Sequence, residues 1–301
     1  MKQILIQNFH PANTAALIRD FKALDYRVIM PKDNWGRISY YFPNDQFEGV
    51  DLLTWEEFLE TPKGDILVAC FEQQNDFRSI SNIHGDRILL HTAGNNVPYD
   101  HGLSQHLLSP DIQTFNNYPA KHKMLYLFAP IIHNFPKDLL NSYKSGIINA
   151  YIHYYSQFWQ DSWSNALKFE QIYGKKCFFY GAETRDGQLS HEEVHRKMVE
   201  SMFTLYFKER DCYGQTVVES MALGTPVIAM RRYVHDKTLG IYFLNEYNSI
   251  LVDSPEEAVG KLRNLSFQEY ENLSKCSIAT VAKLTDNEKR LKQLDYILSQ
   301  N

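Results

Sequence analysis

The sequence lacks the features that mark several common classes of protein. Its cysteines lie far apart with no paired spacing, at Cys70, Cys177, Cys212 and Cys276. That spacing argues against both a disulfide framework and a zinc site. No apolar run approaches the roughly 20 residues needed to span a membrane, and the N-terminal segment MKQILIQNFHP is too short and too polar for a signal peptide. We therefore expect a cytoplasmic protein with reduced thiols and no transmembrane segment.

The sequence also has no surplus of positive charge. Its formal net charge of −5 at pH 7 gives no basic footprint for tight nucleic-acid binding, although a local basic groove is compatible with an acidic total. No G-x-G-x-x-G motif follows the first predicted strand, residues 2–7. A dinucleotide-binding dehydrogenase therefore loses its main support.

What is present is the pattern of an α/β protein. The chain has 301 residues, which is long enough for two domains. Its composition, 44% apolar and 22% charged, is typical of globular proteins. Residues 2–7, 13–24 and 25–31 alternate as strand, helix and strand, with Asn13 as the expected N-cap. This unit is how a doubly wound domain begins. A second alternation starts at residue 147.

The most informative stretch is residues 205–229, LYFKERDCYGQTVVESMALGTPVIA. It predicts a strand, an acidic turn, a helix that ends at Gly224, and a second strand. Asp211 lies in the turn at the carboxyl end of the first strand, where open α/β sheets bind their ligands, and Glu219 lies eight positions later inside the helix. Gly214 lets a ligand approach the backbone, and the helix N-terminus favours phosphate. Because a carboxylate can accept two hydrogen bonds from a vicinal diol such as ribose, the stretch suits a nucleotide-sugar.

The segment DCYGQTVVESMALGTPVIA resembles the donor-binding motif of the retaining GT-B glycosyltransferases of the family 4 type. That motif has an acid, a Gly-aromatic-Gly turn, a second acid eight residues on, and Gly-x-Pro-Val-Ile. The resemblance implies an α/β fold of two facing, doubly wound, Rossmann-like domains with an interdomain cleft. With the polar segment 141–146 as the boundary, we expect an acceptor-side domain at 1–145 and a donor-binding domain at 146–285. A C-terminal helix in 286–301 would cross back to the N-terminal domain.

The resemblance also implies roles for individual residues. Glu219 would bind the ribose of the nucleotide, and Asp211 would face the donor sugar. The residues around the helix start would lie beside sugar and phosphate; they are Tyr213, Gly214, Gln215 and Thr216. The chain departs from the motif by having Asp211 where Glu is usual and Cys212 where Gly is usual, and a carboxylate shorter by one methylene bears on which sugar is held.

In the first domain, the predicted strand 87–91 ends in His91, at a place where such transferases commonly have a histidine near the transferred sugar. His91 is our catalytic candidate with Asp211, although a strand-end histidine satisfied by the backbone fits the pattern equally well. Asp100 and His101 are a weaker candidate for the base that activates an acceptor hydroxyl. For His133, where relatives have a Pro-Asn pair, a structural role is expected.

The departing nucleoside diphosphate needs positive charge, which GT-B enzymes supply without a metal through an Arg and a Lys near the start of the second domain. The corresponding segment 155–163 contains neither. The replacements that the sequence offers are Arg185, Lys208 and Arg210. We expect no metal site and no cofactor beyond the nucleotide-sugar itself.

The expected function is therefore transfer of a hexosyl or pentosyl group from a nucleotide-sugar, with UDP as the expected nucleotide and retention implied by the resemblance. The acceptor would be a saccharide, a lipid-linked molecule or a nucleic acid. Two other interpretations stay open: the same chemistry on a modified DNA base, as in viral enzymes of this fold, and a binding protein that holds a nucleotide-sugar without turnover.

Overall fold

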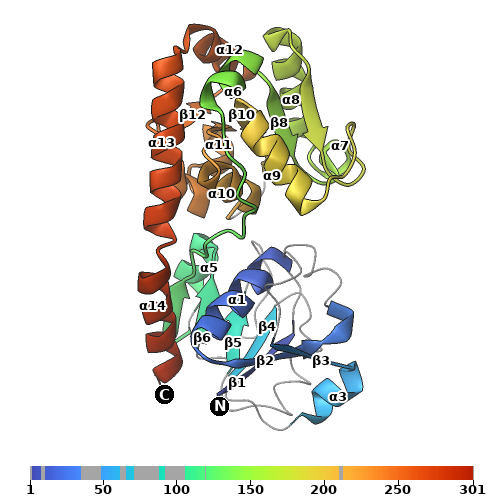
Figure 1. Cartoon of the computed structure of the whole chain (residues 1–301), viewed down its shortest axis with the longest axis vertical. Helices are drawn as coiled ribbons and strands as arrows, with labels where there is room; N and C mark the ends of the chain where they lie inside the picture. Colours follow the sequence, from blue (N-terminus) through green and yellow to red (C-terminus); the bar gives the residue numbers. More distant parts are fainter. Residues whose placement is uncertain are drawn as a thin grey trace. The chain divides into compact units, whose positions relative to one another are not determined.

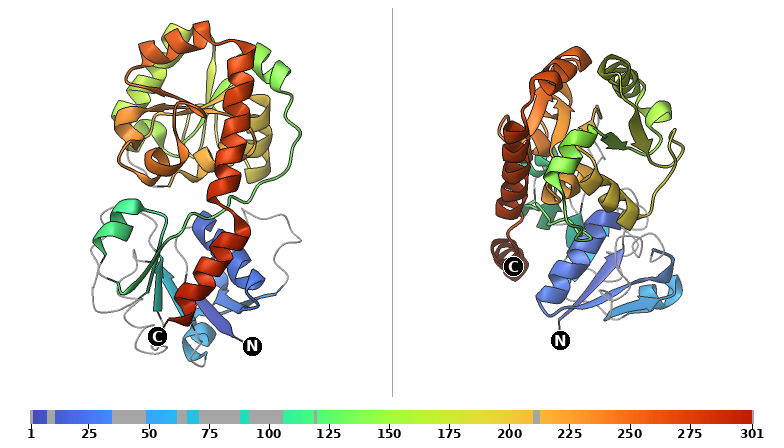
Figure 2. Two further views of the ribbon diagram at one scale, coloured as in Figure 1. Left: turned by 90° about the vertical axis from the view of Figure 1, so that its left-hand side faces the viewer. Right: turned by 45° about the horizontal axis from the view of Figure 1, so that its top comes forward.

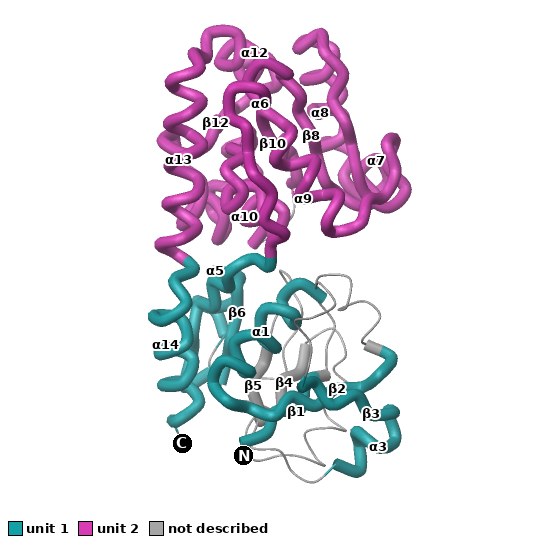
Figure 3. Tube along the Cα trace, viewed as in Figure 1, with its two compact units in different colours: residues 1–131, 285–301 teal, residues 132–284 magenta. Residues whose placement is uncertain are grey.

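The structure is a computed structural model that describes residues 2–7, 11–34, 49–61, 66–70, 88–91, 106–118, 120–209 and 213–300, with the main chain alone at 7, 34, 66–70 and 88–91. The chain divides into two compact units (Figure 3). Unit 1 comprises Met1–Ile131 and Thr285–Asn301, and unit 2 comprises Ile132–Leu284. Each unit is built around its own sheet.

Unit 1 contains a seven-stranded sheet in the order β3-β2-β1-β4-β5-β6-β7. All of the pairings are parallel. The strands are β1 (Gln3–Gln7), β2 (Arg27–Pro31), β3 (Val50–Leu53), β4 (Ile66–Cys70), β5 (Ile88–His91), β6 (His106–Ser109) and β7 (His122–Leu125). Because the chain leaves β1 toward β2 on one side and continues at β4 on the other, this sheet is doubly wound, as predicted.

The helices of unit 1 are α1 (Pro11–Ala23), α3 (Trp55–Glu60), α5 (Ile112–Asn117) and α14 (Asn287–Ser299), with a 3-10 turn η1 (Lys32–Asn34). Helix α1 begins at Pro11, so Asn13 lies inside the helix and is not its N-cap. Proline fits the first turn because its missing N–H has no partner there. Helix α14, at the C-terminus, packs against β7 and belongs to unit 1 (Figure 1).

Unit 2 contains a five-stranded parallel sheet in the order β12-β11-β10-β8-β9. Its strands are β8 (Ile148–Tyr151), β9 (Cys177–Tyr180), β10 (Phe203–Tyr206), β11 (Val227–Met230) and β12 (Ser249–Val252). The two central strands β10 and β11 are buried along their whole length, as expected for a parallel sheet that is covered on both faces.

Helices flank both faces of this sheet (Figure 2). Right-handed crossovers place α8 (Gln160–Tyr173) on one face, where α12 (Pro255–Asn264) packs against it. The opposite face carries α9 (His191–Glu200), α10 (Gln215–Ala222) and α13 (Phe267–Leu284), of which α10 contacts both others. Shorter elements complete the unit: α6 (Leu139–Ser145), α7 (Tyr155–Phe158), α11 (Arg231–Val234) and the π-helical turn η4 (Leu239–Phe243).

The polar segment 141–146, which predicted the domain boundary, is part of unit 2, and the division falls instead after Ile131 and after Leu284. These residues form the end of α6, which Asp138 caps at its N-terminus. Ser142 is buried and donates a hydrogen bond of 2.9 Å to the carbonyl of Val199 at the end of α9. The polar side chains here therefore join helices, whereas the sequence pattern had suggested a linker.

Candidate functional site

The start of α10 lies just beyond the carboxyl end of the central strand β10. Gly214 is the N-cap residue, with φ 58° and ψ 64°, and as a glycine it supplies no side-chain cap to the first turn of this helix. A Cβ at this position would lie 2.4 Å from Cδ1 of Leu239 and 3.1 Å from the hydroxyl of Tyr206. Glycine is therefore required here for two reasons, the left-handed backbone and the close neighbours. The N-terminus of a helix is a common anion-binding site.

Glu219 lies farther along α10 and is 3% exposed. Its Oε1 accepts a hydrogen bond of 2.9 Å from the side-chain amide of Gln215, one turn earlier on the same helix. Nε2 of His191 lies 3.2 Å from the same oxygen, and Nε2 of His195 lies 3.7 Å from Oε2. Both histidines are on α9. The acid that the sequence singled out is thus part of a buried polar cluster between two helices.

The surroundings keep Glu219 ionised. Burial by itself raises the pKa of a carboxyl group. The hydrogen bond from His191 and the attraction of the two imidazoles outweigh that effect and lower the pKa of Glu219 to about 2. The site therefore presents a carboxylate at neutral pH.

The sequence interpretation missed His191 and His195. The signal was present, because histidines four residues apart in a predicted helix lie on one face. What the sequence did not show is that this face packs against α10. His133, which was expected to be structural, also joins the group: its backbone N–H donates a hydrogen bond of 2.9 Å to Nδ1 of His195. The ring of His133 lies 5.5 Å from each of the other two rings, centroid to centroid.

Three imidazoles this close together have to be tested as a metal site. Their potential ligand atoms all lie within 4.8 Å of one another. However, Nδ1 of His195 accepts a hydrogen bond, so in the neutral ring the proton is on Nε2, the nitrogen that faces Glu219. A metal ligand needs a lone pair on that nitrogen and a proton on the other one. The arrangement of His195 thus suits hydrogen bonding to a carboxylate and does not suit metal binding.

Of the predicted phosphate-binding cations, Arg185 lies near the amino ends of the strands of the sheet, and the predicted donor site is at their carboxyl ends. Its guanidinium contacts the carbonyl of Cys177, the first residue of β9, and forms ion pairs with Glu170 (2.7 Å) and Asp186 (3.2 Å). In a parallel sheet the amino end of β9 is opposite the edge where β10 leads to Gly214. The loop after β9 folds back along the strand, since the N–H of Asp186 donates to the carbonyl of Phe179.

Lys208 lies near the carboxyl ends of the strands, where the sequence predicts the donor site. It follows β10, and its Nζ is 5.0 Å from the ring centroid of Trp159, in the segment after β8. Burial lowers the pKa of His153, which also follows β8, and the charge of Lys208 lowers it further. Lys208 is therefore close to the loops that leave the carboxyl ends of both β8 and β10.

The remaining predicted residues divide into two groups. Tyr213 is buried with its ring edge-on to Phe243, and Thr216 is half-buried in the first turn of α10. Outside the described residues lie Asp100, His101, Arg210, Asp211 and Cys212, and of His91 only the main chain is described, at the carboxyl end of β5.

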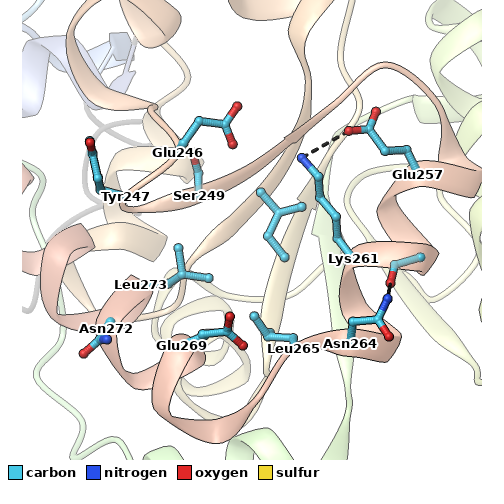
Figure 4. A pocket seen from close by; sticks show the side chains of 12 residues that line it. Glu246, Tyr247, Ser249, Glu257, Lys261, Asn264, Leu265, Glu269, Asn272 and Leu273 are labelled. Atoms are coloured by element: carbon cyan, nitrogen blue, oxygen red, sulfur yellow. Dashed lines mark hydrogen bonds and ion pairs between the residues drawn. The ribbon is translucent and has the colours of Figure 1, made fainter.

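A separate cavity of about 710 Å³ lies beside the edge strand β12, between α12 and α13 (Figure 4). None of the predicted site residues lines it. Its charged groups already have partners within the unit: Lys261 pairs with Glu257 at 3.1 Å, and Glu246 pairs with Arg231 at 2.7 Å. This cavity is therefore not part of the candidate site around α10.

Comparisons with known proteins give the fold. No protein-family model matches the sequence, and no curated protein matches it. The structure is similar to that of HepE from Anabaena in complex with UDP and glucose, with a TM-score of 0.70, 11% identity, and coverage of 99% of this chain and 100% of HepE. The fold is that of the GT-B glycosyltransferases.

Two further GT-B structures match over nearly their full length. A glycosyltransferase from Rickettsia africae has a TM-score of 0.69 at 11% identity and covers 100% of this chain, with 99% of its own length matched. A sucrose-phosphate synthase from Thermosynechococcus elongatus has a TM-score of 0.65 at 12% identity, with 98% of both chains covered. Within the described part of this GT-B chain, no helix is both long and apolar enough to cross a lipid bilayer.

Proposed function

We propose that the chain is a glycosyltransferase that transfers a sugar from a UDP-sugar to an acceptor hydroxyl. The observation that carries this proposal is a pair of hydrogen-bond acceptors on α10 that lack a donor among the described residues. Among the described residues, none donates a hydrogen bond to Oε2 of Glu219, and Oε1 of Gln215 is buried without a partner. The Gln215 amide must turn its nitrogen toward the carboxylate, because two oxygens would repel each other, so its oxygen is left for a ligand. Two neighbouring acceptors match the two O–H donors of a ribose diol.

The sites that we propose for the phosphates of the donor lie at the start of the same helix and close to it. The first turn of α10, at Gly214, Gln215 and Thr216, would hold a phosphate by its amides and the helix dipole. Lys208, at the same edge of the sheet, is our candidate for neutralising the diphosphate as it departs. Arg185 is withdrawn from this role because its two carboxylate partners lie at the opposite edge.

The mechanism that we propose is electrostatic and needs no metal. The helix amides and Lys208 draw negative charge onto the leaving phosphate while the acceptor hydroxyl attacks the anomeric carbon from the same face, which gives retention. Asp211 and His91 would hold the transferred sugar, with Tyr213 beside the donor, as the family 4 resemblance implies, and Arg210 is a further candidate for neutralising the diphosphate. UDP is the nucleotide to test first, since HepE was crystallised with UDP and with UDP-glucose.

A binding protein without turnover is the second candidate, and one observation favours it. Segment 155–163 has no Arg or Lys, and Arg185 is held elsewhere, so less positive charge faces the leaving group than the reaction usually requires. The two candidates differ in one product, because only an enzyme releases free nucleoside diphosphate.

The test combines binding and turnover. Isothermal titration calorimetry with UDP, GDP and ADP identifies the nucleotide, and release of nucleoside diphosphate from the corresponding sugars with and without candidate acceptors measures transfer. We expect UDP to bind and Glu219→Ala to weaken it by about tenfold or more, since a charged hydrogen-bond acceptor is lost. Unchanged UDP affinity in Glu219→Ala would remove the basis of the assignment.

A further inference from the structure

The carboxylate of Glu219 is surrounded by a second layer of residues whose positions are fixed from outside α10. His195 is 0% exposed and His191 is 4% exposed, and both face α10 from one side of α9. Burying a charged carboxylate is costly unless several hydrogen bonds compensate it. Two buried histidines that face one buried acid from the neighbouring helix are therefore an arrangement that needs a reason.

The backbone of His133 determines which nitrogen of His195 carries the proton. Its N–H donates to Nδ1 of His195 at 2.9 Å, so Nδ1 acts as an acceptor. The neutral ring then has its proton on Nε2, and this N–H is directed toward Oε2 of Glu219 at 3.7 Å. That distance is slightly too long for a hydrogen bond, and Nε2 has no other partner among the described residues. His195 thus has an unused N–H donor next to Oε2 of Glu219, the carboxylate oxygen that accepts no hydrogen bond from the described residues.

His191 and Gln215 fix the other oxygen. Both approach Oε1, at 3.2 Å and 2.9 Å, which leaves that atom fully engaged and restricts rotation of the carboxylate. The titratable groups around His195 are His191 on its own helix, His133 on the segment before α6 and Glu219 on α10. Glu192 acts on this group only through its attraction to His133.

We propose that His195 and His191 are positioning residues of the donor site, which orient the carboxylate of Glu219 so that Oε2 faces the nucleotide. This inference rests on the proposed function, in which Glu219 binds the ribose. This role requires no imidazolium, because the neutral ring of His195 with its proton on Nε2 already donates in the required direction. When a ribose hydroxyl binds Oε2, a small movement of the carboxylate brings it into hydrogen-bonding distance of Nε2 of His195.

The first test does not depend on any activity. Long-range ¹H–¹⁵N correlation spectra of the ¹⁵N-labelled protein at pH 7.5 report the tautomer of each imidazole, and the signals that vanish in His195→Gln assign His195. We expect an unprotonated Nδ1 and a protonated Nε2. The opposite tautomer, or a doubly protonated ring, overturns the proposal.

The second test measures UDP affinity and donor KM in matched variants. His195→Met removes the donor and should weaken UDP binding about tenfold, with donor KM rising more than kcat falls. His195→Gln keeps an N–H near Nε2 and should recover most of the loss. His235→Met is the control, since that imidazole is 69% exposed and lies at the end of α11. In Glu219→Ala, adding His195→Met should cost nothing further, because the histidine acts through the carboxylate.

The outcomes separate this inference from the proposed function. If the wild-type protein binds no uridine nucleotide, the proposed function is wrong. The NMR experiment still tests the tautomer of His195 in that case. A wild type that binds UDP, loses it in Glu219→Ala and keeps it in His195→Met defeats the positioning role alone. Additive losses in the double variant also defeat it. If His195→Met does not fold, the same comparison of His191→Met with His191→Gln decides.

Discussion

Arg290 and Asp20 form a buried ion pair that ties the C-terminal helix α14 to α1 within unit 1. Nε of Arg290 lies 2.7 Å from Oδ2 of Asp20, and its Nη2 lies 2.9 Å from Oδ1. The two side chains are 3% and 1% exposed. Burial raises the pKa of Asp20, but the bidentate guanidinium outweighs it and the net shift is downward. The phenol of Tyr126 also donates to Asp20, so this carboxylate is the centre of a buried network.

Replacing Arg290 by Met should therefore destabilise unit 1 by up to about 3–5 kcal/mol, because the buried carboxylate of Asp20 loses its bidentate partner and keeps only Arg19 and Tyr126. Urea denaturation followed by circular dichroism measures the effect. The matched control is Arg27→Met, whose exposed ion pair with Asp51 should be worth about 1 kcal/mol or less. Equal losses in the two variants would show that burial does not distinguish the pairs.

The start of α10 gives a second prediction. Gly214→Ala should lower stability by about 1–2 kcal/mol for its positive φ and by about 1–3 kcal/mol more for the contact with Leu239. Because the clash displaces the first turn of the helix, UDP affinity should fall as well.

The control for this change is Gly187→Ala. Gly187 also has a positive φ, of 80°, but an added Cβ would have no heavy atom within 4 Å. It should show only the backbone cost and leave UDP binding intact. If both variants lose the same stability, the contact at Gly214 contributes nothing.

The ionised state of Glu219 predicts how stability depends on pH. Its folded-state pKa of about 2 is below the model-compound value of 4.5, so its contribution is present above about pH 4.5 and is lost as the pH falls toward 2. The full contribution is on the order of 3 kcal/mol. Denaturation between pH 5 and pH 2.5 should show a steeper loss of stability in the wild type than in Glu219→Gln. Glu200→Gln, which removes an exposed carboxylate on α9, should behave like the wild type, and a Glu219→Gln curve parallel to the wild type would contradict the prediction.

The position of Lys208 predicts a charge effect that is specific to phosphate. Lys208→Met should weaken UDP binding about tenfold at low salt and leave the binding of uridine unchanged, because only the diphosphate needs the cation. Titration calorimetry with both ligands at two salt concentrations measures this. The control is Lys168→Met. Lys168 is an exposed residue of α8 that pairs with Glu256 of α12. An equal loss for uridine would instead indicate damage to packing against Trp159.

Local pattern was enough to predict much of the architecture. The alternation of apolar strands with segments of helical spacing predicted doubly wound sheets, and β10, α10 and β11 follow one another in the order that the sequence pattern predicted. These features depend on neighbours in sequence: the period of apolar residues, a glycine at a left-handed position and a proline after the helix. The same local view placed the domain boundary at residues 141–146, whereas the division falls after Ile131, because local pattern could not show that Ser142 bonds to the end of α9.

The sequence by itself determined that an acid would lie inside a helix that begins at a glycine. Only the tertiary structure decided what surrounds that acid, because α9 and α10 come together through the order of strands in the sheet and not through their own sequences. The same holds for Arg185, which a folded-back loop carries to the far edge, and for Lys208, which the strand order brings close to the segment after β8. Hydrogen bonds between residues that are tens of positions apart depend on how the elements pack, and no single stretch of the chain determines that packing.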